Sequence, residues 1–134
     1  MVQEDARLIS RFLEAWNRDG VAGIEPLLDP DVEWIDPPEL PGAGAHHGRE
    51  ATMQFLREWE GTMGIVNLEF ELDEVLECSD GYLVVSTARG AGEGGSPIPP
   101  HQWFHWIRLD GGCLLWARLF LNRAAALEAT GLSE

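Results

Sequence analysis

The chain changes from helical to strand periodicity within the stretch Asp29-Pro30-Asp31-Val32-Glu33-Trp34-Ile35-Asp36-Pro37. A helix before this stretch has to stop ahead of its first proline, because proline disfavours helical geometry in the residue that precedes it. Beyond that proline, apolar and polar residues alternate, which predicts a short strand over residues 31–36. Val32, Trp34 and Asp36 share one face of this strand, so a carboxyl group lies beside a tryptophan just before the second proline.

Two helices are predicted upstream of this strand. The first ends near Asp19-Gly20 and has one apolar face, whose stripe at three- and four-residue spacing consists of Leu8, Ile9, Phe12, Leu13 and Trp16. The second is shorter and stops before residues 29–30; it carries Ile24, Leu27 and Leu28. The predicted fold therefore begins with helices.

Downstream of the strand, residues 37–44 read PPELPGAG. Their prolines exclude a helix or a paired strand, and the segment is long enough to act as a lid over a site. His46 and His47 are expected to continue this loop. A second amphipathic helix then ends near residues 61–64 and carries the stripe Thr52, Phe55, Leu56 and Trp59.

The rest of the chain is typical of antiparallel sheet. Residues 66–73 alternate without interruption, which predicts a buried face made of Val66, Leu68, Phe70 and Leu72. Ser79-Asp80-Gly81 is a hairpin turn leading to a strand over 82–89, and a Gly/Pro-rich loop over 90–100 follows. Further strands over 101–109 and 113–122 flank the turn Asp110-Gly111-Gly112, and a short helix over 124–129 ends the chain.

Helices gathered at the start and a meander afterwards predict an α+β fold, with the helices packed on one face of a curved antiparallel sheet. The 134 residues, 45% of them hydrophobic, match the length and core of one ordinary domain. We therefore expect a single domain over 1–134.

The charge balance excludes several classes of partner. Nine basic residues against 23 acidic ones give a net charge of −14, which repels nucleic acid and anionic lipid surfaces. No apolar run approaches the roughly 18 residues that span a bilayer, and the N-terminus lacks the basic and apolar parts of a signal peptide. We expect a soluble, cytoplasmic protein that binds neither nucleic acid nor membrane.

Neither the cysteines nor the histidines predict a metal site. Cys78 and Cys113 are expected to be free, partly buried thiols, with a single disulfide as the alternative. His101 and His105 share a strand face but lie roughly 13 Å apart at about 3.3 Å per residue, too far for one ion. We expect no metal and no other cofactor.

Four segments together resemble the SnoaL-like branch of the nuclear-transport-factor-2-like (NTF2-like) superfamily, which includes ketosteroid isomerases, polyketide cyclases and limonene epoxide hydrolases. The segments are Phe12-Leu13-Glu14-Ala15-Trp16-Asn17, the strand stretch over 29–37, His47-Gly48-Arg49-Glu50 and Asp110-Gly111-Gly112. They span essentially the whole chain in the same order. The resemblance implies a cone, in which the curved sheet wraps the N-terminal helices and its concave face lines an apolar pocket.

The resemblance also implies roles for single residues. Ketosteroid isomerases carry a general-base aspartate at the end of the first strand, and Asp36 matches that position. Their two oxyanion donors correspond here to Phe12 and His105, so one donor is lost and the other replaced. Steroid isomerisation is therefore expected to be slow or absent, and the substrate smaller.

Several of these roles have an ordinary structural alternative. Asp36 could simply start a turn before proline, and His105 could be a core histidine with its hydrogen bonds satisfied. The six tryptophans could be core packing or the walls of a ligand site. The resemblance turns His101, Trp103 and His105 toward the cone, and Gln102, Phe104 and Trp106 toward the outer face.

The predicted function is a pocket that binds a small hydrophobic ligand and performs general acid–base chemistry on a carbonyl compound. Asp36 would be the base, and His105 or Arg89 would stabilise the developing oxyanion. The candidate ligand-binding residues are Phe12, Trp16, Trp34, Phe55, Trp59, Arg89 and Trp103.

Two alternatives from other classes are a non-catalytic ligand-binding domain and a dimeric accessory domain of the same fold. A homodimer is expected through the outer face of the last strands, with Arg118 at the interface. The apolar residues expected on that face are Phe104, Trp106, Trp116 and Phe120.

Overall fold

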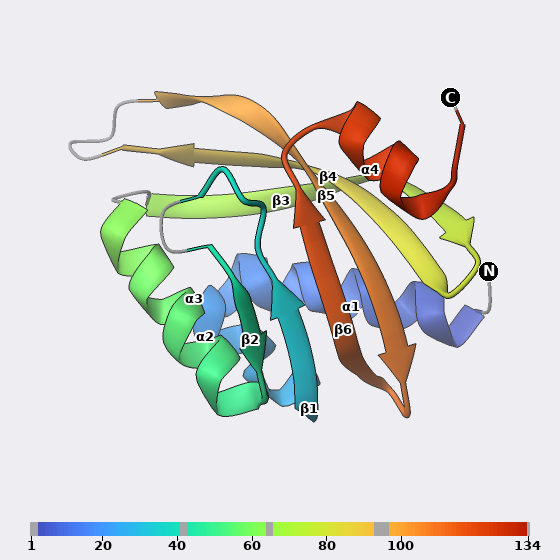
Figure 1. Ribbon diagram of the computed structural model, residues 1–134. Coiled ribbons are helices and arrows are strands. Elements are labelled where there is room, and N and C mark those ends of the chain that lie inside the picture. The colour runs from blue at the N-terminus through green and yellow to red at the C-terminus, as the bar shows by residue number, and fades with distance from the viewer. Residues whose placement is uncertain (1–2, 41–42, 64–65, 93–96, 134) are drawn as a thin grey trace.

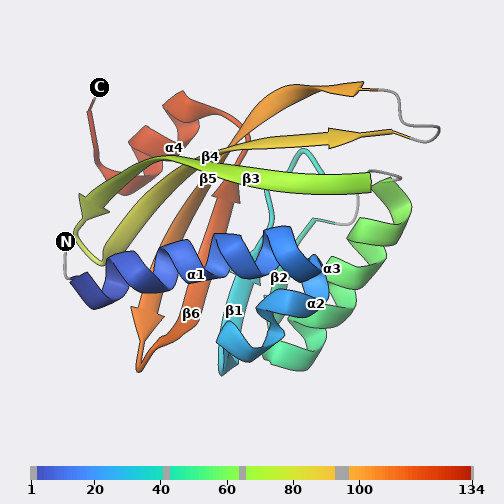
Figure 2. The same cartoon turned by 180° about the vertical axis from the view of Figure 1, so that it is seen from behind.

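The computed structural model describes residues 3–40, 43–63, 66–92 and 97–133, and Figures 1 and 2 show its ribbon from opposite sides. The first half of the chain contains α1 (Gln3–Asp19), α2 (Val21–Ile24), the 3-10 helix η1 (Glu25–Leu27), β1 (Leu28–Ile35), β2 (Ala45–His47) and α3 (Arg49–Met63). The second half contains β3 (Val66–Cys78), β4 (Gly81–Ala91), β5 (Pro97–Asp110), β6 (Cys113–Phe120) and α4 (Arg123–Thr130).

One six-stranded curved sheet, in the order β2-β1-β6-β5-β4-β3, organises the fold. α1 crosses its concave face, and α3 lies beside β2 and β1 (Figure 2). The α+β cone with N-terminal helices on the concave face is thereby confirmed. The expectation of a purely antiparallel sheet is wrong at one pair, because β1 runs parallel to β6, with Trp34 opposite Ala117. Four further strands separate the two in sequence, so no hairpin turn dictates their direction.

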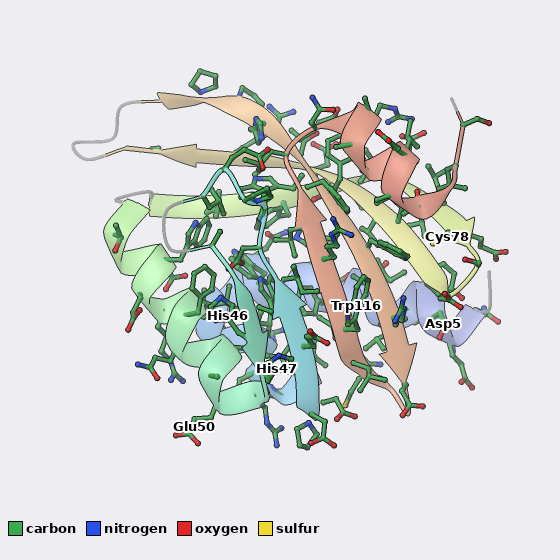
Figure 3. All side chains as sticks on the ribbon, viewed as in Figure 1. Asp5, His46, His47, Glu50, Cys78 and Trp116 are labelled. Atoms are coloured by element: carbon green, nitrogen blue, oxygen red, sulfur yellow. The ribbon has the colours of Figure 1, made fainter. Side chains whose placement is uncertain are left out.

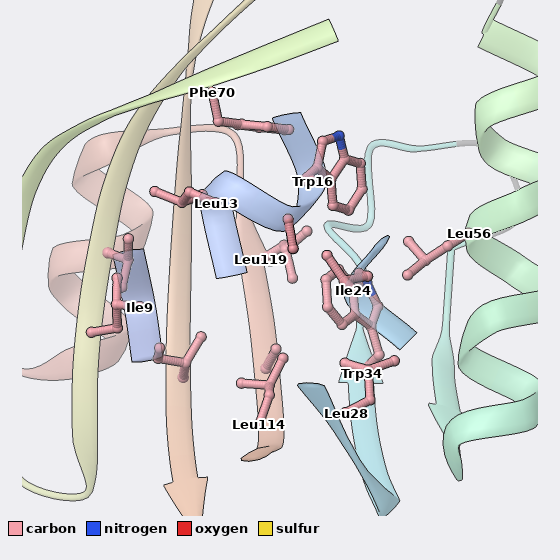
Figure 4. Packing of buried hydrophobic residues seen from close by; sticks show 14 of the residues in the cluster. Ile9, Leu13, Trp16, Ile24, Leu28, Trp34, Leu56, Phe70, Leu114 and Leu119 are labelled. Carbon is pink, nitrogen blue, oxygen red and sulfur yellow. The ribbon is translucent and has the colours of Figure 1, made fainter. Parts of the chain in front are cut away.

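The main core lies between α1 and the concave face of the sheet (Figure 4). Trp16 on α1 packs edge-on against Phe70 on β3, with ring centroids 5.3 Å apart. Trp34 on β1 is 2% exposed and faces the same core. The strand-face assignment of Trp34 is therefore confirmed.

The opposite, outer face of the sheet is partly covered by α4 (Figure 1). Asn122 caps this helix by accepting a hydrogen bond from the Ala125 amide. The helix packs over Phe104 and Phe120, which are 2% and 8% exposed. The expectation that these two residues form an open dimer face is wrong, because the C-terminal helix already buries them within one chain.

Several predicted boundaries shift in the structure. Leu28 begins β1 instead of ending a helix, and β1 runs through Pro30. His46 and His47 belong to β2, so the expectation of a loop there is wrong. The predicted loop over 90–100 is shorter, since β4 reaches Ala91 and β5 begins at Pro97; its residues 93–96 lie outside the described part of the chain.

The predicted alternation of β3 fails at Leu72, which is 39% exposed. The pairing of β3 with β4 shifts between Leu72 and Glu74, and such a bulge turns the following residues by one position. Val75 then takes the core-facing place that strict alternation would give to Glu74. A bulge depends on the pairing between strands, so periodicity along one strand does not reveal it.

A pair of hydrogen bonds fastens α1 to β3. The Asn17 amide donates to the Phe70 carbonyl at 2.9 Å and accepts from the Phe70 amide at 2.7 Å. We expect Asn17→Ala to lower the free energy of unfolding by about 2 kcal/mol, because both backbone groups of Phe70 lose a partner. Urea unfolding measures this loss. Glu14→Ala, an exposed position on the same helix, is the control and should change stability by less than about 0.5 kcal/mol.

Candidate functional site

A cavity of about 30 Å³ opens between α1, α3 and the concave face of the sheet. We call it the Asp36 cavity. Eight residues expected at the site line it, namely Phe12, Trp16, Trp34, Asp36, Phe55, Trp59, Trp103 and His105. Leu40, from the proline-rich segment, also lines it, in keeping with the expectation that this segment covers the mouth.

Arg89 is the one expected site residue that the structure does not bring to this cavity. Its side chain is 59% exposed on β4, and its Nε lies 3.7 Å from a carboxylate oxygen of Glu71. Arg89 therefore faces the solvated side of the sheet next to β3. The expectation that Arg89 lies at the pocket is therefore wrong.

Asp36 carries the polar chemistry of the cavity. It directly follows β1, and its side chain is 1% exposed. Oδ1 accepts a hydrogen bond from Trp34 Nε1 at 3.1 Å, and Oδ2 lies 2.8 Å from His46 Nε2. Both oxygens thus contact side chains, Trp34 of the cavity lining and His46 of β2, in addition to the backbone of Gly44 in the loop.

Burial raises the pKa of Asp36 above its ordinary value, because the low-dielectric surroundings penalise the charged carboxylate. The hydrogen bond and the charge of His46 oppose this rise, as do hydrogen bonds from Trp34 and the backbone. A carboxylate that combines a raised pKa with positioned hydrogen-bond donors is suited to accept a proton near neutral pH.

His46, which contacts Asp36, is the candidate site residue that sequence reasoning missed. It lies on β2 directly opposite Trp34, and Figure 3 shows it on that short strand beside α3. Its ring stacks on Phe55 with centroids 4.2 Å apart, while its neighbour His47 is 75% exposed. The signal that could have found it is the proline-rich loop itself, since residues flanking a hairpin loop lie opposite each other.

His105 occupies an aromatic environment on β5. Its ring centroid lies 6.4 Å from those of Trp34 and Phe70 and 6.3 Å from that of Trp103. Within the described residues, neither ring nitrogen has a hydrogen-bond partner, which argues against a satisfied core histidine. Burial lowers the pKa of His105 to about 4, so the imidazole is neutral at pH 7 and offers one N–H to a ligand oxygen.

Trp59 offers a second N–H. Its indole is held edge-on between Trp16 and Trp103, with centroid distances of 6.2 Å to each. Its Nε1 is buried and has no hydrogen-bond partner among the residues that the structure describes. An unpaired buried donor costs about 1–3 kcal/mol, a cost that a ligand oxygen would remove.

Over the described ranges, no group of three or more His, Cys, Asp and Glu residues lies close enough to hold a metal ion. Cys78 and Cys113 are both free and half-buried, as expected. None of the described helices is long and apolar enough to cross a membrane.

The model of the SnoaL-like domain matches residues 9–118 of this chain. A comparison with curated protein sequences finds no match. Solved structures do match over nearly the whole chain. An NTF2-like protein of unknown function from Burkholderia pseudomallei K96243 is 20% identical with a TM-score of 0.75, covering 96% of this chain and 98% of its own.

Two further solved structures share the fold. The protein TerC, co-crystallised with polyporic acid, is 17% identical with a TM-score of 0.73, and the match covers 96% of this chain and 99% of TerC. A protein from Jannaschia sp. CCS1, named as a SnoaL-like polyketide cyclase, is 18% identical with a TM-score of 0.69 and coverages of 98% and 94%. At these identities the likeness shows the fold alone.

Proposed function

Because the chain belongs to the SnoaL-like domain family, we propose that its Asp36 cavity binds a small apolar carbonyl compound and removes a proton from the carbon next to the carbonyl. The observation that carries this proposal is a carboxylate 1% exposed in an otherwise apolar cavity, with both oxygens positioned by Trp34 and His46. A desolvated and oriented carboxylate is the usual form of a general base.

The chemistry follows from the atoms around the cavity. An oxygen of Asp36 takes the proton, and the electron pair of the broken C–H bond moves to the carbonyl oxygen, giving an enolate. The neutral His105 N–H would hydrogen-bond that oxygen, and Trp59, whose Nε1 has no partner among the described residues, also lines the cavity. Return of the proton to another carbon gives isomerisation. Alternatively, the enolate carbon attacks a second carbonyl of the same molecule to close a ring, and the proton taken by Asp36 goes to the new alkoxide oxygen.

The ligand class is supported by the cavity walls and by the neighbours in structure. Aromatic and aliphatic side chains form nearly all of the lining, which favours a flat apolar molecule. One neighbour was crystallised with polyporic acid, and another is named as a polyketide cyclase. A steroid is a poor candidate, since Phe12 stands where a hydroxyl donor would be needed; losing one such donor costs on the order of 3 kcal/mol.

The experiment that tests this function is proton exchange in heavy water. A panel of small apolar ketones is incubated with the protein, and NMR follows deuterium incorporation at the carbon next to the carbonyl. We expect exchange above the buffer rate for at least one class of ketone. Ligand-dependent quenching of tryptophan fluorescence without exchange would instead favour a non-catalytic binding domain, since Trp16, Trp34, Trp59 and Trp103 all line the cavity.

His46 should set the pH range in which Asp36 acts. Its hydrogen bond and charge lower the pKa of Asp36, so His46→Phe keeps a ring against Phe55 but lets that pKa rise further. The acid limb of the pH–rate profile is expected to move to higher pH. The exchange rate near pH 6 should fall on the order of tenfold, because a hydrogen bond to a charged group contributes about 1.5–3 kcal/mol.

The exposed neighbour provides the control for this prediction. His47→Phe, on the same strand, should leave the profile in place, because that side chain is 75% exposed and lies away from Asp36. An unchanged profile in His46→Phe would contradict the role given to His46.

We also propose that the chain forms a homodimer through the outer sheet face. Because α4 covers Phe104 and Phe120, the interface would consist of Trp106, Trp116 and Arg118. The two indoles pack edge-on with centroids 4.9 Å apart, and both are only half-buried in one chain. Light scattering at micromolar protein should give twice the 14.9 kDa chain mass. The mass of a single chain would contradict the dimer and leave the cavity proposal untouched.

A further inference from the structure

A second cavity of about 30 Å³ lies directly behind the Asp36 cavity. We call it the apolar cavity. The residues that distinguish it from the first include Leu8, Ile9, Val84, Ile107, Leu114 and Ala117, contributed by α1, β4, β5 and β6. His105 is the one polar side chain in its lining. Cavities with an apolar lining of this kind stay dry.

The two cavities have a common wall made of Phe12, Leu13, Trp34 and His105. Protein interiors are packed with few voids. Two adjoining cavities that only single side chains separate therefore indicate one larger cavity, which these side chains divide in two. His105 borders both halves, and its unpaired N–H lies at their boundary. A ligand oxygen bound there would leave one part of the ligand on each side.

Phe12 is the wall residue best able to move. Trp34 is held by its hydrogen bond to Asp36, and Leu13 is buried at 9% exposure. Phe12 is only half-buried, and it makes no ring contact with another aromatic side chain in the described chain. A change of the Phe12 rotamer would break no hydrogen bond.

We propose that the two cavities are halves of one elongated ligand site and that Phe12 controls passage between them. The ligand class is a ketone with its carbonyl at the His105 boundary, an acidic C–H facing Asp36 and an unbranched apolar tail in the apolar cavity. The placement of the carbonyl and of the acidic C–H rests on the function proposed above. The placement of the apolar tail rests on the apolar cavity alone.

Methyl n-alkyl ketones from 2-butanone to 2-decanone test the proposal through NMR of labelled Ile, Leu and Val methyl groups. Among the methyl-bearing residues that line a single cavity, short ketones are expected to shift only Leu40, Leu56 and Leu119, which line the Asp36 cavity alone. Long ketones should also shift Ile9, Val84 and Ile107 in the apolar cavity. Affinity should rise with chain length by up to about fourfold per buried methylene.

Ala117→Leu fills the apolar cavity, since Ala117 is fully buried in its wall. It is expected to abolish the gain in affinity with chain length. The wild-type methyl shifts decide the question even if this variant fails to fold.

The possible outcomes separate the two proposals. Shifts confined to Leu40, Leu56 and Leu119 for every ketone would overturn the two-cavity site while leaving the proposed function standing. Shifts of Ile9 and Ile107 without any shift of Leu56 would contradict both, because the apolar cavity would then bind alone. A chain-length gain that persists in folded Ala117→Leu would also overturn the two-cavity site.

Discussion

Asp36→Asn should reduce the rate of proton exchange into a bound ketone by about 10²- to 10⁴-fold, the usual contribution of a positioned general base. Asparagine has nearly the same shape and can still accept the hydrogen bond from Trp34 Nε1, which reaches Oδ1 at 3.1 Å. It cannot accept a proton near neutral pH. The measurement is the deuterium-exchange rate of wild type and variant at equal protein concentration.

The same substitution should not weaken the fold at neutral pH. Burial raises the pKa of Asp36, so the protonated side chain contributes most to stability below its unfolded-state pKa of about 3.8, and this contribution is lost as pH rises through the folded-state pKa. At pH 7 the charged group is a cost that asparagine removes. Urea unfolding should therefore show the variant at least as stable as wild type at pH 7.

Asp31→Asn supplies the matched control, because Asp31 is exposed on the same strand. It should change neither exchange nor stability appreciably. Exchange that survives in folded Asp36→Asn would identify another base and remove Asp36 from the mechanism.

Much of this site was predictable because the signals for it are local. Alternation along β1 places Trp34 and Asp36 on one face, and the helical stripes bring Phe12, Phe55 and Trp59 toward the sheet. Periodicity of 2.0 or 3.6 residues reports which side of an element is buried, and it needs no knowledge of the partner. The eight expected residues that line the cavity all come from such patterns or from the family resemblance.

The features that sequence reasoning missed depend on pairing between distant segments. β2 has three residues, too few for a periodic pattern, so His46 was expected in a loop. The bulge that follows Leu72 and the cover that α4 gives to Phe104 are likewise properties of neighbouring elements. The prediction that Arg89 lies at the pocket was wrong because the local sequence does not indicate which face of a strand an arginine side chain occupies.

His105 gives the second large expected effect, a pH-dependent loss of stability. Burial lowers its pKa from 6.5 to about 4, so its contribution is fully present above pH 6.5 and is lost as pH falls toward 4. At pH 4 this loss amounts to about 3 kcal/mol, or roughly a 150-fold change in the folding equilibrium. Other groups also titrate over this range. The effect of His105 is therefore taken as the difference in the free energy of unfolding between wild type and His105→Phe.

Urea unfolding of wild type and His105→Phe between pH 7 and pH 4 measures that difference. Relative to wild type, the free energy of unfolding of His105→Phe should rise by about 3 kcal/mol as the pH falls. The free energy of unfolding of His47→Phe, a change at an exposed position, should have the same pH dependence as that of wild type. A gap that does not change with pH would mean that the His105 ring is hydrated and able to take up a proton. It would then be no desolvated, neutral donor, and the enolate oxygen would have to rely on Trp59 Nε1.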